Sequence, residues 1–188
     1  KIIKPVIFRP GDVVVLVDST WDAPAMLQAL KLMREQCYLR FGAMVHDVFP
    51  LTIPHMCEQT TVMHYRNWFA QALPLCDFVV TNSEATKDAL LGYLKTDTQY
   101  RDPSTLPCAS FTLGSSFEPF EQGGEQDFAG WVTQWTGTVF LMGGTIEPRK
   151  NHAIALEALE QLAGRLDVTL VIIGQIGWHS EDILERIS

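Results

Sequence analysis

Short apolar runs alternate with longer amphipathic segments along most of this chain. Residues 12–18 (DVVVLVD) are β-branched and almost wholly apolar, which is typical of a strand buried on both faces. Similar runs predict further strands at residues 41–45, 78–81, 108–113, 138–142 and 168–173.

Apolar residues at helical spacing predict helices between these strands. Pro24 suits the first turn of a helix, and Asp22 before it is a plausible N-cap. Ser83 is a second predicted N-cap. The pattern predicts one helix from residue 24 and others at residues 58–73, 83–95, 151–163 and 180–187. Strands that alternate with helices pair in parallel through crossovers, so we predict an α/β fold.

The alternation is interrupted once. Residues 118–126 (EPFEQGGEQ) are acidic, contain two adjacent glycines and show no period, which is typical of a linker or loop. The sequence therefore predicts two strand–helix groups, one on each side of this segment.

Composition narrows the class of protein. The chain has 188 residues, with 22 Asp and Glu against 14 Lys and Arg, and its formal net charge is −8. This balance argues against sequence-independent nucleic-acid binding, which needs a basic face, but it leaves room for a local basic pocket. No apolar run approaches the roughly 18 residues of a membrane span. The chain begins with Lys rather than Met, so we expect a piece of a longer protein or a processed form.

The four cysteines suggest no metal or redox site. No two are close enough for a Cys-x-x-Cys pair, so we expect buried free thiols in a cytoplasmic protein. The sequence also contains no His-Glu-x-x-His motif, and we predict no metal site.

Residues 143–151 (GGTIEPRKN) carry the strongest chemical signal. They follow a predicted strand and open a predicted helix, where unpaired N–H groups favour an anion. Arg149 and Lys150 add two cations at this helix end, which is unfavourable unless an anion lies between them and the helix. A solvated Arg-Lys pair in a loop explains the pattern equally well. The segment matches neither a Walker loop nor a Gly-x-Gly-x-x-Gly fingerprint.

Several segments together resemble a known family. GGTIEPRKN and then LVIIGQIGW (residues 170–178) resemble the start of the C-terminal domain of glycosyltransferase family 4, which has the GT-B fold. HDVFPLTIP (46–54), CDFVVTNSEATKDAL (76–90) and FTLGSSFEP (111–119) agree with it in order. The resemblance is greatest to the bacterial mannosyltransferase-like branch.

This resemblance implies two Rossmann-like, doubly wound parallel-sheet domains, both incomplete in this chain. Residues 1–117 would be the later part of the N-terminal, acceptor-side domain. Residues 118–136 would be a linker or loop, and residues 137–188 the first part of the C-terminal domain that binds the nucleotide-sugar donor.

The resemblance also implies which residues bind the donor. Arg149 and Lys150 would hold its diphosphate, together with Gly144 and Thr145. The chain departs from many relatives at Thr145, where they carry an arginine. The partner of each cation therefore stays open.

Four other residues are candidates for the cleft. His46 would be catalytic and lie near the transferred sugar, although a hydrogen-bonded structural histidine at a strand end is the alternative. Asp47, Ser83 and Gly174 would lie near the nucleotide. Helix capping explains Ser83 without function, and backbone tolerance explains Gly174.

The implied activity is a retaining transfer of a hexose to a saccharide or lipid-linked acceptor in polysaccharide biosynthesis. The branch resemblance implies GDP-mannose as the sugar donor, with UDP- and dTDP-sugars left open, and no cofactor is expected. The sequence has no Asp-x-Asp motif, which speaks against metal-dependent GT-A transferases. We expect a cytoplasmic location, with peripheral association at the inner face of the membrane as a further expectation.

One family feature is missing. The sequence contains no Glu-x7-Glu pair, whose glutamates contact the donor sugar and ribose. We therefore expect residues 1–188 alone to be inactive. The alternative is a non-catalytic nucleotide-sugar-binding or scaffold fragment.

Overall fold

A computed structural model describes residues 6–18, 20, 21, 23–97, 99–115, 130 and 134–187. The chain divides into two compact units, Lys1–Ser115 and Ser116–Ser188. The predicted loop at residues 118–126 lies outside the described residues.

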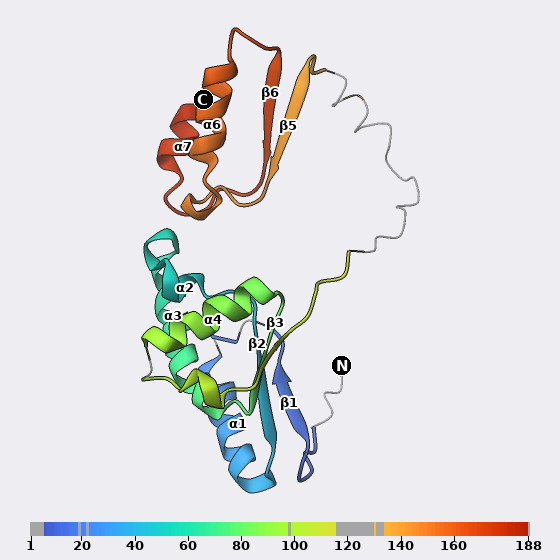
Figure 1. Ribbon diagram of the computed structural model, residues 1–188, viewed down its shortest axis with the longest axis vertical. Coiled ribbons are helices and arrows are strands. Elements are labelled where there is room, and N and C mark those ends of the chain that lie inside the picture. The colour runs from blue at the N-terminus through green and yellow to red at the C-terminus, as the bar shows by residue number, and fades with distance from the viewer. Residues whose placement is uncertain are drawn as a thin grey trace. The chain divides into compact units, whose positions relative to one another are not determined.

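The first unit is built on a parallel sheet of four strands (Figure 1). They pair in the order β1 (Val13–Leu16), β2 (Arg40–Val45), β3 (Phe78–Thr81) and β4 (Cys108–Ser110). The helices are α1 (Pro24–Cys37), α2 (Phe49–Thr52), α3 (Gln59–Ala72) and α4 (Glu84–Thr96), with 3-10 turns at Pro54–Met56, Leu73–Leu75 and Pro103–Thr105. The parallel pairing confirms the predicted α/β fold.

One hydrophobic core joins this sheet to its helices. Phe41 and Val79 from the strands pack in the same cluster as Leu27 of α1, Phe69 of α3 and Leu90 of α4. The core therefore fixes the strands relative to the helices, and with them the loops that follow the carboxyl ends of the strands.

Strand β1 differs from its prediction. It pairs only with β2, so it lies at one edge of the described sheet. Val14 and Leu16 face the core, whereas Val13 is 51% exposed and Val15 is 38% exposed. The expectation of burial on both faces is therefore wrong, because its apolar side chains alternate between a packed face and an open one.

Element ends follow local capping and strand pairing. Glu58 and Ser83 are N-caps whose side chains accept hydrogen bonds from backbone N–H groups, as predicted for Ser83. The prediction that Asp22 is the N-cap of the first helix is wrong, because the N-cap is Ala23, which makes no side-chain cap bond. Asp22 itself lies outside the described residues. β4 ends at Ser110, short of the predicted residue 113, because Ser110 pairs with the last residue of β3.

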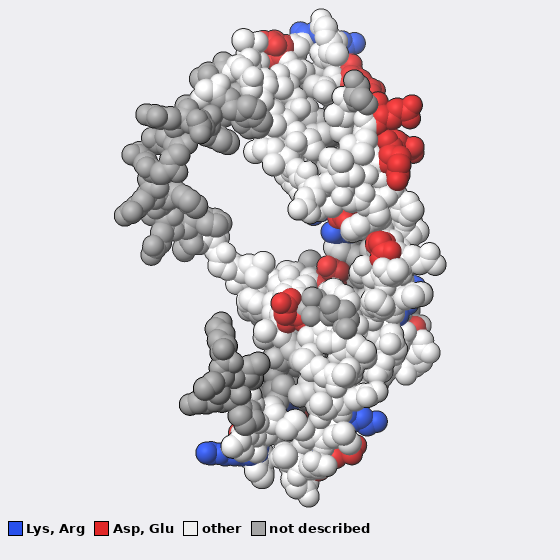
Figure 2. All heavy atoms as spheres, turned by 180° about the vertical axis from the view of Figure 1, so that it is seen from behind, with Lys and Arg blue, Asp and Glu red and all other residues white. Residues whose placement is uncertain are grey.

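The second unit has two parallel strands, β5 (Thr138–Gly143) and β6 (Val168–Ile173). Helices α6 (His152–Leu162) and α7 (Glu181–Ile187) lie on the same side of these strands (Figure 1). A 3-10 turn, η4 (Pro148–Lys150), precedes α6. Acidic side chains gather along one side of this unit (Figure 2), and α6 and α7 carry Glu157, Glu160, Glu181, Asp182 and Glu185.

All four cysteines are free thiols. Cys76 is buried, but Cys37, Cys57 and Cys108 are half-buried. The expectation of buried thiols therefore holds only for Cys76. The other three lie at or beyond the end of a helix, turn or strand, and Cys108 packs partly buried against the core.

Candidate functional site

The loops after β5 and β6 are joined by backbone hydrogen bonds at the carboxyl end of the second sheet. Gly144 N–H donates to the Ile173 carbonyl at 2.8 Å, and Ile146 N–H donates to the Gln175 carbonyl at 2.8 Å. Gly177 N–H returns a bond to the Ile146 carbonyl at 3.0 Å. Ligands of open α/β sheets bind outside this end of the strands, so the joined loops form the first candidate site.

Glycines allow these loops to approach so closely. A Cβ atom at Gly174 would lie 1.8 Å from the Gly144 carbonyl oxygen, and one at Gly177 would lie 2.8 Å from the Thr145 Cγ2. Gly144 has φ +133°, a conformation that side chains rarely adopt. Gly144, Thr145 and Gly174, all predicted from the sequence, are therefore brought together here.

The two cations of this loop have different surroundings. The Arg149 Nη2 donates to the Glu147 Oε1 at 2.5 Å, and the Glu147 side chain is only 2% exposed. Lys150 is exposed, and its Cε lies 3.7 Å from where a Cβ of Gly144 would stand. Lys150 thus extends along bare glycine backbone, where an anion can reach its ammonium group.

Helix α6 begins directly after these cations. Asn151 is its N-cap and has φ +53°, a left-handed conformation that turns the chain from η4 into the helix. Asn151 makes no side-chain cap bond, so the helix end is not capped by its own residue.

His152, the first residue of α6, was not singled out by sequence reasoning. It is 2% exposed, and neither ring nitrogen has a hydrogen-bond partner among the described residues. A buried polar group without a partner is rare in folded proteins. No sequence signal marked this residue, because its burial depends on tertiary packing.

The carboxyl end of the first sheet carries His46, which is exposed and follows β2. Its Nε2 donates to the Val17 carbonyl oxygen at 3.0 Å, after β1. A carbonyl oxygen can only accept, so Nε2 carries a hydrogen and Nδ1 of the neutral ring is an acceptor. One ring nitrogen of His46 is thus hydrogen-bonded within the protein, and the other can accept a hydrogen bond from a ligand.

Neighbouring residues at this sheet edge have structural contacts. The Asp47 Oδ1 accepts from Phe49 N–H at 3.1 Å, and its carbonyl oxygen accepts from the Tyr65 hydroxyl at 2.8 Å. The Ser83 Oγ accepts from Thr86 N–H at 3.1 Å, which confirms that Ser83 caps α4. A nucleotide role for Asp47 or Ser83 stays a prediction.

Thr86 at this edge was missed by sequence reasoning, and the contact of Glu84 with Ser110 was not predicted. The Thr86 hydroxyl donates to the His46 carbonyl oxygen at 3.3 Å and so links α4 to the end of β2. Glu84 accepts from the Ser110 hydroxyl and is paired with Lys87, and these hydrogen bonds hold the pKa of Glu84 below its usual value. Both contacts join segments far apart in sequence, which a local pattern cannot reveal.

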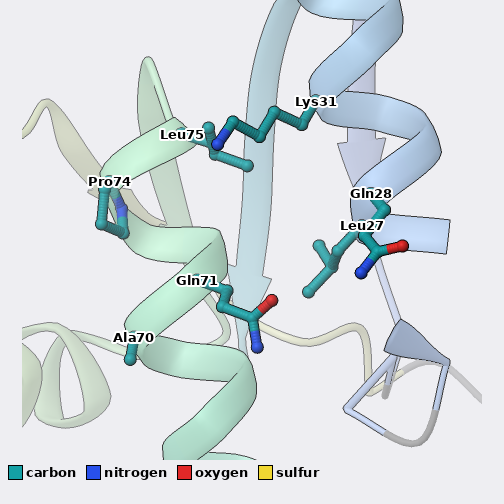
Figure 3. Close-up of a pocket in the computed structure, with 7 residues that line it drawn as sticks. All are labelled: Leu27, Gln28, Lys31, Ala70, Gln71, Pro74 and Leu75. Atoms are coloured by element: carbon teal, nitrogen blue, oxygen red, sulfur yellow. The ribbon is translucent and has the colours of Figure 1, made fainter. Parts of the chain in front are cut away.

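A pocket lies elsewhere in the first unit, between α1 and the end of α3 (Figure 3). Its volume is about 410 Å³, and Lys31 extends across it toward Leu75. Pro74 and Leu75 precede β3, whereas Ser83 follows that strand. This pocket is therefore at the opposite end of β3 from the candidate residues.

The described residues contain neither a metal-binding cluster nor a helix able to span a membrane. In that part of the chain, no three His, Cys, Asp or Glu side chains are grouped so that they could hold a metal ion. No described helix is both long enough and apolar enough to cross a membrane.

The chain is similar to curated proteins named serotype-specific mannosyltransferase WbdA, from Escherichia coli. Three of them are 26%, 25% and 26% identical to it over 195 aligned residues, which cover 98% of this chain. This similarity supports the assignment of the chain to a glycosyltransferase family. The chain spans less than a quarter of the length of these relatives. No family model matches the chain.

The structure brings Gly144, Thr145, Lys150 and Gly174 together in the second unit, while Arg149 beside them is bound to Glu147. His46, Asp47 and Ser83 belong to the first unit. Their roles toward a nucleotide sugar stay predictions.

Proposed function

We propose that this chain is part of a retaining mannosyltransferase of glycosyltransferase family 4 with the GT-B fold. It would transfer mannose from GDP-mannose to a saccharide or lipid-linked acceptor during polysaccharide synthesis. The proposal includes no metal or other cofactor. It places the protein in the cytoplasm, with peripheral association at the membrane that carries a lipid-linked acceptor.

The observation that carries the proposal is the position of Lys150 over the glycine backbone of Gly144. This arrangement lies at the carboxyl end of two parallel strands and at the start of α6, and a helix N-terminus generally favours an anionic group. The names of the relatives add the sugar and the reaction class.

The chemistry would rest on positioning and on stabilisation of the leaving diphosphate. Lys150 would offset the negative charge that grows on the diphosphate as the bond to the sugar breaks. His46 would act on the sugar side, where its Nδ1 can accept a hydrogen bond from a substrate hydroxyl. The acceptor oxygen would then bond to the anomeric carbon on the face that the diphosphate leaves, with retention of the α configuration, and the hydroxyl proton would pass to the leaving diphosphate.

The test uses the protein expressed from its complete gene, with GDP-, UDP- and dTDP-sugars as donors. We expect transfer from GDP-mannose and a loss of more than tenfold in the Lys150→Ala variant. The matched control is Arg165→Ala, an exposed cation beyond the other end of α6. Transfer from none of the three donor classes would refute the proposal. Unchanged transfer in the Lys150 variant would refute the role of that residue.

A further inference from the structure

Arg149 and Lys150 are adjacent in sequence, but their contacts in the structure differ. We propose that Glu147 and Arg149 are positioning residues, in which Arg149 neutralises the buried Glu147 carboxylate, and that Lys150 alone meets the donor diphosphate. This inference rests on the proposed function. It departs from the expectation, drawn from the family resemblance, that both cations hold the diphosphate.

The first argument is charge compensation. The Arg149 Nη2 lies 2.5 Å from the Glu147 Oε1, so the two full charges cancel at short range. The Glu147 side chain is 2% exposed, and it would be left as an unpaired buried carboxylate if Arg149 turned to a phosphate. Removing one partner of a buried ion pair is strongly unfavourable, because the other charge then lacks compensation.

The second argument is that Glu147 also fixes the backbone of Lys150. The Glu147 carbonyl oxygen accepts from Lys150 N–H at 3.1 Å and closes the η4 turn. Ile146, which precedes Glu147, exchanges two backbone hydrogen bonds with the loop after β6. Through these contacts Glu147 is anchored to both loops, and the turn that presents Lys150 is anchored through it.

The third argument is exposure. The Lys150 side chain is exposed and runs past Gly144, where no side chain intervenes, whereas the Arg149 side chain is 28% exposed. A lysine acts as a compact point charge with three donors, which suits a flexible approach to phosphate oxygens. Lys150 is therefore the cation of this turn whose charge is open to a ligand.

Two changes that remove the pair as a unit test this division. In the protein from its complete gene, Arg149→Met leaves the Glu147 charge buried, and we expect its affinity for GDP to fall at least tenfold. Adding Glu147→Gln removes that stranded charge, so the double variant should return to within threefold of the unaltered protein. Lys150→Met should lose at least tenfold, and a second change at Glu147 should not restore it.

The measurement is the Kd for GDP, UDP and dTDP by isothermal titration calorimetry, together with KM and kcat for the sugar donor. The control is the exposed pair of the same unit, Arg186 and Glu160, whose N–O distance is 2.9 Å. Arg186→Met combined with Glu160→Gln should leave the Kd within twofold. In steady-state kinetics, Arg149→Met should raise KM with little change in kcat, and KM should return to its original value in the double variant.

The results separate the two proposals. A double variant as weak as Arg149→Met would show that Arg149 itself binds the diphosphate and would overturn the inference. Arg149→Met with an unchanged Kd would also overturn it, because Glu147 would then not need Arg149 to compensate its charge. If Arg149→Met does not fold, the double variant decides alone. Failure of the unaltered protein to bind any of the three nucleotides would overturn the proposed function, and this inference with it.

Discussion

Replacing Gly174 with alanine probes how closely the two loops of the second unit must approach. The new Cβ would lie 1.8 Å from the Gly144 carbonyl oxygen and 2.5 Å from its carbonyl carbon. A carbon–oxygen contact normally needs about 3.3 Å, so the backbones would have to separate by about 1.5 Å. That shift would break the bonds from Gly144 N–H to Ile173 and from Ile146 N–H to Gln175, both 2.8 Å long.

The cost can be estimated from these contacts. Forcing extra volume into a packed site costs about 1–3 kcal/mol, and each lost backbone hydrogen bond adds about 1 kcal/mol. We therefore expect the loops to lose about 3–5 kcal/mol of stability. At about 1.4 kcal/mol per tenfold change, amide hydrogen exchange at Gly144 and Ile146 should become at least about 100-fold faster.

The assay is hydrogen exchange followed by mass spectrometry on peptides that cover the two loops. The matched control is Gly92→Ala in the middle of α4, where a Cβ meets nothing within 4 Å. Alanine is the better helix former by about 1 kcal/mol, so this variant should be slightly more stable. Exchange in the Gly174 variant within threefold of the unaltered protein would refute the close approach of the loops.

Two further predictions concern buried polar groups. His152→Leu should raise the free energy of unfolding by about 1–2 kcal/mol, because it replaces a buried ring without partners; a loss of stability in urea denaturation would contradict this. Burial raises the pKa of Cys76 to about 12, whereas a thiol in the unfolded chain ionises near pH 9. The stabilising contribution of this thiol is therefore full below pH 9 and is lost as pH rises toward 12, at about 1.4 kcal/mol per pH unit. Urea unfolding between pH 9 and pH 10.5 should show a steeper loss in the unaltered protein than in Cys76→Ala, and equal slopes would count against the raised pKa.

The order of strands and helices could be predicted from the sequence because it depends on local signals. For example, the Ser83 hydroxyl oxygen accepts a hydrogen bond from Thr86 N–H, three residues later, and this spacing is visible in the sequence. The end of β4 could not be predicted, because its length is set by where β3 stops. The exposure of β1 likewise depends on its place in the sheet, which its own residues do not record.

In the candidate site, too, local sequence signals predicted some features, while others depend on tertiary contacts. The glycines and cations of residues 143–151 were found from the sequence, since they cluster between a strand and a helix. The difference between Arg149 and Lys150 was not, because it arises from the burial of Glu147. Thr86 was missed for a similar reason, as its contact with His46 joins residues forty positions apart.

The small core of the second unit explains why its loops depend on polar contacts. Among its described residues, only Ile146 and Leu156 are buried apolar side chains, while Glu147, His152 and Ser180 are buried polar ones. The geometry of the cationic turn is therefore fixed by hydrogen bonds, among them the backbone bonds of Ile146 and Lys150, rather than by apolar packing. Such contacts are directional, so they hold Lys150 in place before any ligand arrives. Under the proposed function, such placement would lower the entropy lost when a diphosphate binds, and Glu147 would contribute to binding without touching the ligand.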